Sequence, residues 1–323
     1  MEGYIYLSSI SYLLGDSLAF PLKGSSKKYI NKERIDSYEN LIKYSEIPYL
    51  YSNDYAIFLA SLDSLLIGFS CDDLQEKYLS LIKEGKYKGD KDLTDINPSI
   101  RRSVERHFID GIPSYMSGGI KNSENGNGVL FRGLAFFLYL YRDKMDLTEK
   151  EIFDLIDKYS SVSHQHFKSK ISLGIFGMVV FSLIDNYKSE EKKDIKDIVK
   201  ESIKKAYNYY KNISYISYTM ESFERIFSDD FFDIDKNELR GGAFVIDTLE
   251  NILYSLGNST SFEDSMIKAL SFGKDTSANV GLTCGLSSLY YGLDNKYDKY
   301  IKNIKNIHEI KKLVNEFGGR YES

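Results

Sequence analysis

The sequence has no tryptophan, and its 323 residues include only two cysteines and four prolines. Cys71 and Cys284 lie far apart in the chain, so no disulfide framework is expected. This cysteine usage is typical of a reducing compartment, and we predict a cytoplasmic protein. Because prolines are so few, long stretches of the chain are free to form helices.

Long apolar runs and blocks of basic residues are also missing. No uninterrupted apolar run reaches the roughly 18 to 20 residues that a membrane-spanning helix needs. No basic segment precedes the first apolar run, so we predict no signal peptide. The net charge is −5, and lysines alternate with acidic residues, which argues against nucleic acid as the main partner. We therefore expect a soluble protein that binds neither membranes nor nucleic acid.

Apolar residues three and four positions apart predict amphipathic helices in several segments. The pattern is clearest in four groups: Ile195, Ile198, Val199, Ile203 and Ala206; Ile301, Ile304, Ile307, Ile310, Val314 and Phe317; Leu59, Leu62 and Leu66; and Val245, Leu249 and Leu253. No comparable series of alternating strands is present. We predict an all-α fold forming one domain over residues 1–323, with the polar residues 73–100 as an exposed excursion or small cap.

Two predicted helix starts carry clusters of side-chain oxygens. Asp275 is placed as a helix N-cap, and Ser277 follows it. Ser52, Asn53 and Asp54 place three such oxygens before another apolar run. Both clusters suit ordinary helix capping. The same geometry also presents oxygen ligands to a cation in a cleft.

Glycine-rich loops precede two other predicted helices. In the segment NGNGVLFRG, Gly126 and Gly128 flank Asn127 and would let backbone N–H groups approach a phosphate, with Arg132 one turn into the helix. The pair Gly241 and Gly242 opens a similar segment, which also contains Phe244. His164 and His166 lie in the segment SHQH, where a pair spaced i, i+2 with no other His or Cys nearby favours a structural role over metal binding.

Six segments, taken in order, resemble the ADP-ribosylglycohydrolase family, which includes the enzyme that releases ADP-ribose from dinitrogenase reductase. The resemblance covers the chain from about residue 3 to about residue 293. The matching segments are GDSLAFPLKG (15–24), SNDY (52–55), GNGVLFR (126–132), SHQH (163–166), GGAFVIDTLENIL (241–253) and GKDTSANVGLTCGLSSLYYG (273–292). The corresponding family segments are similar to GDALGAPVEG, TDDT, GNGAAMR, THPH, GSGYVVDTLEAAL and GGDTDTIAAIAGALAGAYYG.

The resemblance implies an ADP-ribose cleft with two neighbouring magnesium or manganese ions. The family's metal ligands fall at Ser52, Asn53, Asp54, Asp275, Ser277 and Ala278. Only Asp54 and Asp275 are carboxylates here, and Ala278 has no ligand atom. Two carboxylates do not balance two divalent ions, so we expect one weakly held magnesium or manganese ion, or none.

The family's acid position falls at Lys23. A lysine cannot act as a carboxylate base, but its cation could hold a phosphate or hydroxyl in place of the missing metal charge, or it could be a solvated loop residue. Asp54, Asp275 and Lys23 are the candidate catalytic residues. The candidate ligand-binding residues are Gly126, Asn127, Gly128, Arg132, His164, Gly241, Gly242 and Phe244. For Phe244, stacking on an adenine and packing in the core both remain open.

Several functions are compatible with these residues. The protein could be a hydrolase that cleaves the N- or O-glycosidic bond of an ADP-ribosyl or related nucleotide-sugar group. It could instead be a pseudoenzyme that binds such a group, or a protein partner, as an immunity or sensing factor. A third option is altered chemistry that uses Lys23 and Asp54. The expected partners are an ADP-ribose-type ligand or an ADP-ribosylated protein.

Overall fold

The computed structural model describes residues 3–45, 49–144 and 146–319. The α-helices are α1 (Tyr4–Ala19), α2 (Lys27–Lys32), α3 (Tyr38–Ser45), α4 (Asn53–Leu65), α5 (Cys71–Lys83), α6 (Pro98–Phe108), α7 (Gly128–Asp143), α8 (Glu149–Ser161), α9 (Phe167–Lys188), α10 (Ile195–Tyr210), α11 (Ser217–Met220), α12 (Glu224–Phe227), α13 (Val245–Gly257), α14 (Phe262–Leu270), α15 (Thr276–Tyr291), α16 (Asp298–Asn303) and α17 (Ile307–Gly318). Short 3₁₀ helices join them: η1 (Phe20–Leu22), η2 (Ser114–Met116), η3 (Asn122–Glu124), η4 (Ser214–Ile216), η5 (Glu221–Phe223), η6 (Lys236–Glu238) and η7 (Asn295–Tyr297).

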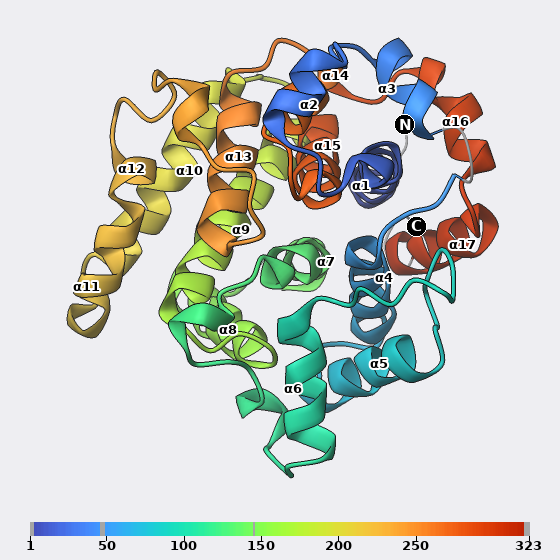
Figure 1. Cartoon of the computed structure of the whole chain (residues 1–323). Coiled ribbons are helices and arrows are strands. Elements are labelled where there is room, and N and C mark those ends of the chain that lie inside the picture. Colours follow the sequence, from blue (N-terminus) through green and yellow to red (C-terminus); the bar gives the residue numbers. More distant parts are fainter. Residues whose placement is uncertain (1–2, 46–48, 145, 320–323) are drawn as a thin grey trace.

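The prediction of an all-α fold is confirmed, since these described ranges contain no β-strand. In Figure 1, α7 lies near the middle of the molecule, with α4, α9 and α15 around it, and all three contact it. Two isolated backbone bridges pair Gly119 with His164 and Gly126 with Phe244.

The helices α1 and α15, from opposite ends of the sequence, form the most extensive helix–helix contact. Small residues allow it. A Cβ atom on Gly15 would lie 2.7 Å from Cys284 Sγ, and one on Gly281 would lie 2.6 Å from the Tyr12 ring. This close approach places the C-terminal part of α1 beside the N-terminal part of α15, where the candidate site lies.

The helix α9 is long and apolar enough to cross a membrane by length and composition. It has 22 residues, and its most apolar window has a mean hydropathy of 1.6, although Lys168, Lys170 and Asp185 interrupt the apolar sequence near its ends. Of that window, 72% is buried inside the protein. The helix packs against α7, α8, α10, α13 and α15. Such burial is what a core helix shows, so α9 alone does not indicate a membrane span.

The predicted apolar helix faces are buried in the structure, except that Leu66, which follows the last residue of α4, is partly buried. All five residues of the first group lie on the buried face of α10. The C-terminal group is also buried, but it spans two helices, α16 and α17, rather than one. The chain leaves the helical path at Ile304, which is extended (φ −61°, ψ 136°), and Asn306 adopts a left-handed conformation (φ 57°) just before α17 begins.

Residues 73–100, expected as an exposed excursion or small cap, contain structure of two kinds. Residues up to Lys83 belong to α5, which buries Leu74, Tyr78 and Leu81 and packs against α4 and α6. The following residues form an irregular loop that leads to Asn97, the N-cap of α6. The first part is therefore a packed helix, and the loop is the part that reaches the candidate site.

Candidate functional site

Asp54 is held at the start of α4 by local capping. Ser52 is the N-cap of this helix, and its Oγ accepts a hydrogen bond from the Asp54 backbone N–H at 3.1 Å. The Asp54 side chain is only 5% exposed, and its Oδ2 accepts a hydrogen bond from Ser277 Oγ at 3.2 Å. The same oxygen is 2.9 Å from Lys23 Nζ, so residues of three matching segments, 15–24, 52–55 and 273–292, meet at this carboxylate.

Asp275 is the N-cap residue of α15, as predicted, but its side chain makes no capping hydrogen bond. The carboxylate instead accepts a hydrogen bond from Asn127 Nδ2 at 2.6 Å through Oδ2. Burial, together with the neighbouring charge of Asp54, raises the pKa of Asp275 to about 6. Asp275 therefore directs its carboxylate toward Asn127 and Lys23 and does not cap its own helix.

The ammonium group of Lys23 lies among three carboxylates. Its Nζ is 2.9 Å from Asp54 Oδ2, 3.7 Å from Asp275 Oδ1 and 3.7 Å from Asp95 Oδ2. Burial alone would lower the pKa of Lys23, but Asp54 and Asp275 outweigh this effect and hold the pKa above its usual range. Lys23 is therefore a fixed positive charge at neutral pH. We call Lys23, Asp54, Asp95 and Asp275 the Lys23 cluster.

Backbone hydrogen bonds fix the two loops that carry Lys23 and Asp275. Gly24 N–H donates to Lys274 O and Lys274 N–H donates to Ser25 O, both at 2.6 Å. Asp275 N–H donates to Gly241 O at 2.9 Å, which ties in a third loop. Because all these contacts are made by the main chain, the fold fixes the backbone of the Lys23 loop relative to Asp275, and the contact with Asp54 then orients the ammonium.

Asp16 lies behind the cluster and is fully buried in α1. Its Oδ1 accepts from Ser52 N–H at 2.7 Å, and its Oδ2 accepts from Ser52 Oγ at 2.6 Å. Burial, and next the charge of Asp54, raise the pKa of Asp16 to about 8. Asp16 thus connects α1 to the start of α4 and is mostly neutral near pH 7.

Asn127 and the segment before α13 form one wall of the site. Asn127 Nδ2 also donates to Thr248 Oγ1 at 2.9 Å, and Asn127 N–H donates to Ala243 O at 2.9 Å. Gly126 forms a backbone bridge with Phe244. The half-buried ring of Phe244 is therefore held next to the loop that orients Asp275.

Arg132 and His164, predicted as ligand-binding residues, are fully buried instead. The Arg132 guanidinium donates to the carbonyl oxygens of Tyr159 and Ser160 at 2.8 and 2.9 Å and lies over the Tyr159 ring. His164 Nδ1 is 2.7 Å from Ser163 Oγ, and burial, followed by the charge of Arg132, lowers the pKa of His164 far below its usual value. Their placement does not support contact with a ligand and suits a structural role.

The remaining predicted residues divide between the cluster and its supports. Asn53 Nδ2 donates to Asp95 Oδ1 at 3.1 Å, so Asn53 holds the loop carboxylate beside Lys23. Ser52 turns its hydroxyl to Asp16 and away from Lys23. Gly128 is the first residue of α7, and a Cβ there would meet the Asn97 side chain at 2.8 Å. Gly242 O accepts a hydrogen bond from Thr248 Oγ1 at 3.3 Å.

Asp95 and Asp16 were not among the predicted site residues. Asp95 lies in the irregular loop before α6, where no periodicity or motif distinguishes it from neighbouring aspartates. Asp16 is part of a matching segment, but its link to Ser52 forms only when α1 packs beside α4. A search for polar residues at helix starts finds neither position.

The residues present do not fit the two-ion site that the resemblance implies. In the three described ranges, no group of three or more His, Cys, Asp or Glu side chains is arranged to hold a metal ion. Lys23 Nζ already stands 2.9 Å from Asp54 Oδ2. Unit charges 4 Å apart interact by about 4 kcal/mol at an effective dielectric near 20, so a divalent ion beside the ammonium would be repelled by about 8 kcal/mol. The Lys23 ammonium therefore competes with a divalent ion for the same carboxylates.

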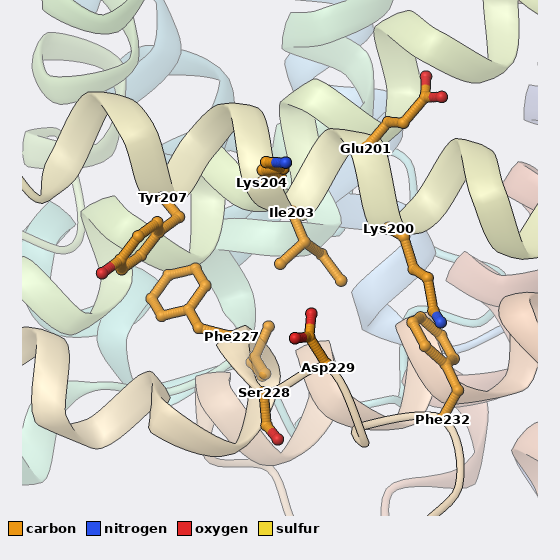
Figure 2. Close-up of a pocket in the computed structure, with 10 residues that line it drawn as sticks. Lys200, Glu201, Ile203, Lys204, Tyr207, Phe227, Ser228, Asp229 and Phe232 are labelled. Atoms are coloured by element: carbon orange, nitrogen blue, oxygen red, sulfur yellow. The ribbon is translucent and has the colours of Figure 1, made fainter.

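A separate groove of about 330 Å³ lies between α10 and the segment that follows α12. Figure 2 shows Ile203 and Phe227 facing each other across the groove. Lys200 lies beside Phe232, and Asp229 lies between Phe227 and Phe232. The groove shares no residue with the Lys23 cluster. Its lining mixes apolar residues with charges of both signs and does not indicate a particular ligand, so the functional assignment rests on the cluster.

Comparisons with known proteins agree with this fold. Residues 10–323 match the family model described as ADP-ribosylglycohydrolase. A solved structure titled "ADP-ribosylglycohydrolase-related protein complex" superposes with a TM-score of 0.71 and 19% sequence identity, covering 97% of this chain and 96% of that one. At this identity, the structural likeness shows the fold alone. No curated protein matches the chain significantly.

Proposed function

The chain belongs to the ADP-ribosylglycohydrolase family, and we propose that it binds an ADP-ribosyl group without the metal-dependent cleavage that the family resemblance implies. The observation that carries this proposal is the Lys23 ammonium, which stands 2.9 Å from Asp54 and 3.7 Å from Asp275. These are the two carboxylates left at the family's metal positions. Because the Lys23 ammonium compensates part of their charge from within the chain, these carboxylates are poorly placed to hold an ion that activates water.

The Lys23 ammonium can still serve as a binding group. Among the described carboxylates, only that of Asp54 lies within hydrogen-bond distance of the ammonium. The carboxylates of Asp95 and Asp275 are each 3.7 Å away. An ammonium carries three N–H donors, so donors remain for a ligand hydroxyl or phosphate oxygen. The Lys23 side chain is 27% exposed, which gives such a ligand access.

Lys23 is poorly suited to act as a base. The carboxylates of Asp54 and Asp275 hold its pKa above the usual range, so it keeps its proton at neutral pH. Altered chemistry based on Lys23 as a base is therefore less well supported than binding. Recognition of an ADP-ribosylated partner, as in a sensing or immunity protein, is compatible with the same geometry.

We expect ADP-ribose to bind with the same affinity in magnesium buffer and in buffer containing a chelator. Isothermal titration calorimetry under both conditions measures this directly. Incubation with peptides ADP-ribosylated on arginine or serine should release no ADP-ribose under either condition. Loss of binding on chelation, or release of ADP-ribose only with magnesium, would restore the metal-dependent hydrolase. Absence of any binding would refute ADP-ribosyl recognition.

Phe244 is the aromatic residue we expect to contact the ligand. Substitution Phe244→Ala should weaken ADP-ribose binding about tenfold, because stacking on a base contributes about 1.4 kcal/mol or more. The control is Tyr218→Ala, which removes another aromatic ring, 82% exposed, on α11. Equal affinity of the Phe244 variant and the wild-type protein would assign this ring to packing only.

A further inference from the structure

The surroundings of Lys23 have the charge pattern of a cation site whose cation is part of the chain. Three carboxylates approach one positive centre from three different segments: Asp54 from α4, Asp275 from the start of α15 and Asp95 from the loop before α6. Ser277 Oγ is 3.2 Å from the Asp54 oxygen that contacts the ammonium.

We infer that the Lys23 ammonium occupies the place of a divalent cation and that it is what keeps such an ion away from these three carboxylates. Lysine carries one positive charge and three carboxylates surround it, so the cluster retains negative charge when all of them are ionised. Removal of the lysine would leave Asp54, Asp95 and Asp275 facing an uncompensated gap. Hard divalent cations bind such oxygen donors.

Neutral oxygens are also available to complete a coordination shell. Asn53 Oδ1 is buried and has no hydrogen-bond partner among the described residues, while its amide nitrogen holds Asp95. Asp95 has a 54% exposed side chain, so it can move toward an ion without disturbing the core. The exclusion of cations therefore depends on Lys23 more than on a shortage of oxygen ligands.

The test is to measure Mn²⁺ binding from the free-ion signal in electron paramagnetic resonance for the wild-type protein and three Lys23 variants. Lys23→Ala should bind Mn²⁺ at least 30-fold more tightly than the wild type, because it removes the cation. Lys23→Glu should bind at least as tightly as Lys23→Ala, because it adds a carboxylate. Lys23→Arg keeps the positive charge and should bind no better than the wild type.

A further substitution, at one of the carboxylates, tests where the ion binds. In Lys23→Ala combined with Asp54→Asn, Mn²⁺ binding should return to the wild-type level. If Lys23→Ala folds poorly, Lys23→Glu with the same Asp54→Asn change gives the same comparison, and a rise in melting temperature on adding Mn²⁺ reports binding independently.

Mn²⁺ binding by the wild type that equals binding by Lys23→Ala would overturn the inference, as would gained binding that survives Asp54→Asn. If Lys23→Ala and Lys23→Glu both fold but neither gains Mn²⁺ binding, the inference is also overturned. These measurements use no ADP-ribose, so they are independent of the proposed ligand. If the protein fails to bind ADP-ribose, the Lys23 variants can still gain Mn²⁺ binding. If the Lys23 variants gain no Mn²⁺ binding, the protein can still bind ADP-ribose.

Discussion

Substitution Asp16→Asn is expected to stabilise the protein increasingly as the pH rises, with the gain over wild type growing by about 2 kcal/mol from pH 5 to pH 8. Burial raises the pKa of Asp16 to about 8 in the folded protein. A raised carboxyl pKa means that the folded state binds the proton more tightly than the unfolded state does. Stability is therefore present at low pH and lost as the pH rises from about 4 to about 8.

The size of this effect follows from the shift of the Asp16 pKa. A tenfold change in proton affinity corresponds to about 1.4 kcal/mol, so raising the pKa of Asp16 from its ordinary value to about 8 sets an upper limit of about 6 kcal/mol, and relaxation around the ionised group reduces it. The asparagine keeps the contact with Ser52, because its amide can donate to Ser52 Oγ while its oxygen accepts from Ser52 N–H. Denaturant unfolding at several pH values, followed by circular dichroism, measures the change.

Other groups also titrate in this window, so the comparison must be made between variants. Burial raises the pKa of Asp275 to about 6 and that of Glu250 to about 7, and both shifts act in the same direction as that of Asp16. The control Asp92→Asn makes the same chemical change at an exposed loop position. A pH dependence of Asp16→Asn identical to that of the wild type would show that Asp16 is ionised in the folded protein at pH 5.

The helices could be predicted from sequence because burial repeats along them with a regular period. The apolar faces of α10 and α13 are buried where the spacing places them. The break between α16 and α17 is not visible in that spacing, since Ile304 is buried although it lies outside both helices. The break consists of an extended residue at Ile304 and a left-handed residue at Asn306, which are local backbone features that apolar periodicity does not encode.

The candidate site could be predicted only in part. The resemblance identified Asp54, Asp275 and Lys23 separately, and the structure brings them to one point. The sequence alone did not decide whether Lys23 is a solvated loop residue or replaces the missing metal charge. The answer depends on which carboxylates the fold brings beside the Lys23 side chain. Asp95 completes the cluster from an irregular loop, and such loops leave no periodic pattern to read.

Two residues predicted to bind a ligand are fully buried in the structure, which shows what a matching segment does not reveal. Arg132 and His164 belong to matching segments and have side chains suited to ligands. The helix α7 nevertheless turns Arg132 into the core, where backbone carbonyls take the place of an anion. A polar residue type indicates what a site could do, whereas helix rotation decides whether the residue reaches the site.

The adjacent glycines Gly241 and Gly242 are expected to differ sharply in their tolerance of a methyl group. Substitution Gly241→Ala should lower the free energy of unfolding by about 3 kcal/mol, because overpacking against rigid neighbours costs about 1–3 kcal/mol or more. Its Cβ would lie 2.2 Å from Phe272 O and 2.3 Å from Gly273 O, and both are backbone atoms. Gly241 O also accepts the hydrogen bond from Asp275 N–H, so the same shift would displace Asp275.

Gly242→Ala is the matched control, because the nearest atom to its Cβ is the end of the flexible Asp247 side chain at 3.0 Å. We expect it to cost less than about 1 kcal/mol. As the chain has no tryptophan, urea unfolding is followed by circular dichroism or tyrosine fluorescence. Equal destabilisation by both substitutions would refute the assignment of Gly241 to close loop packing. If Gly242→Ala leaves stability unchanged but weakens ADP-ribose binding, Gly242 contacts the ligand. Gly241 then shapes the loop that holds Asp275. The glycine pair, predicted as one binding element, would thus have two separate roles.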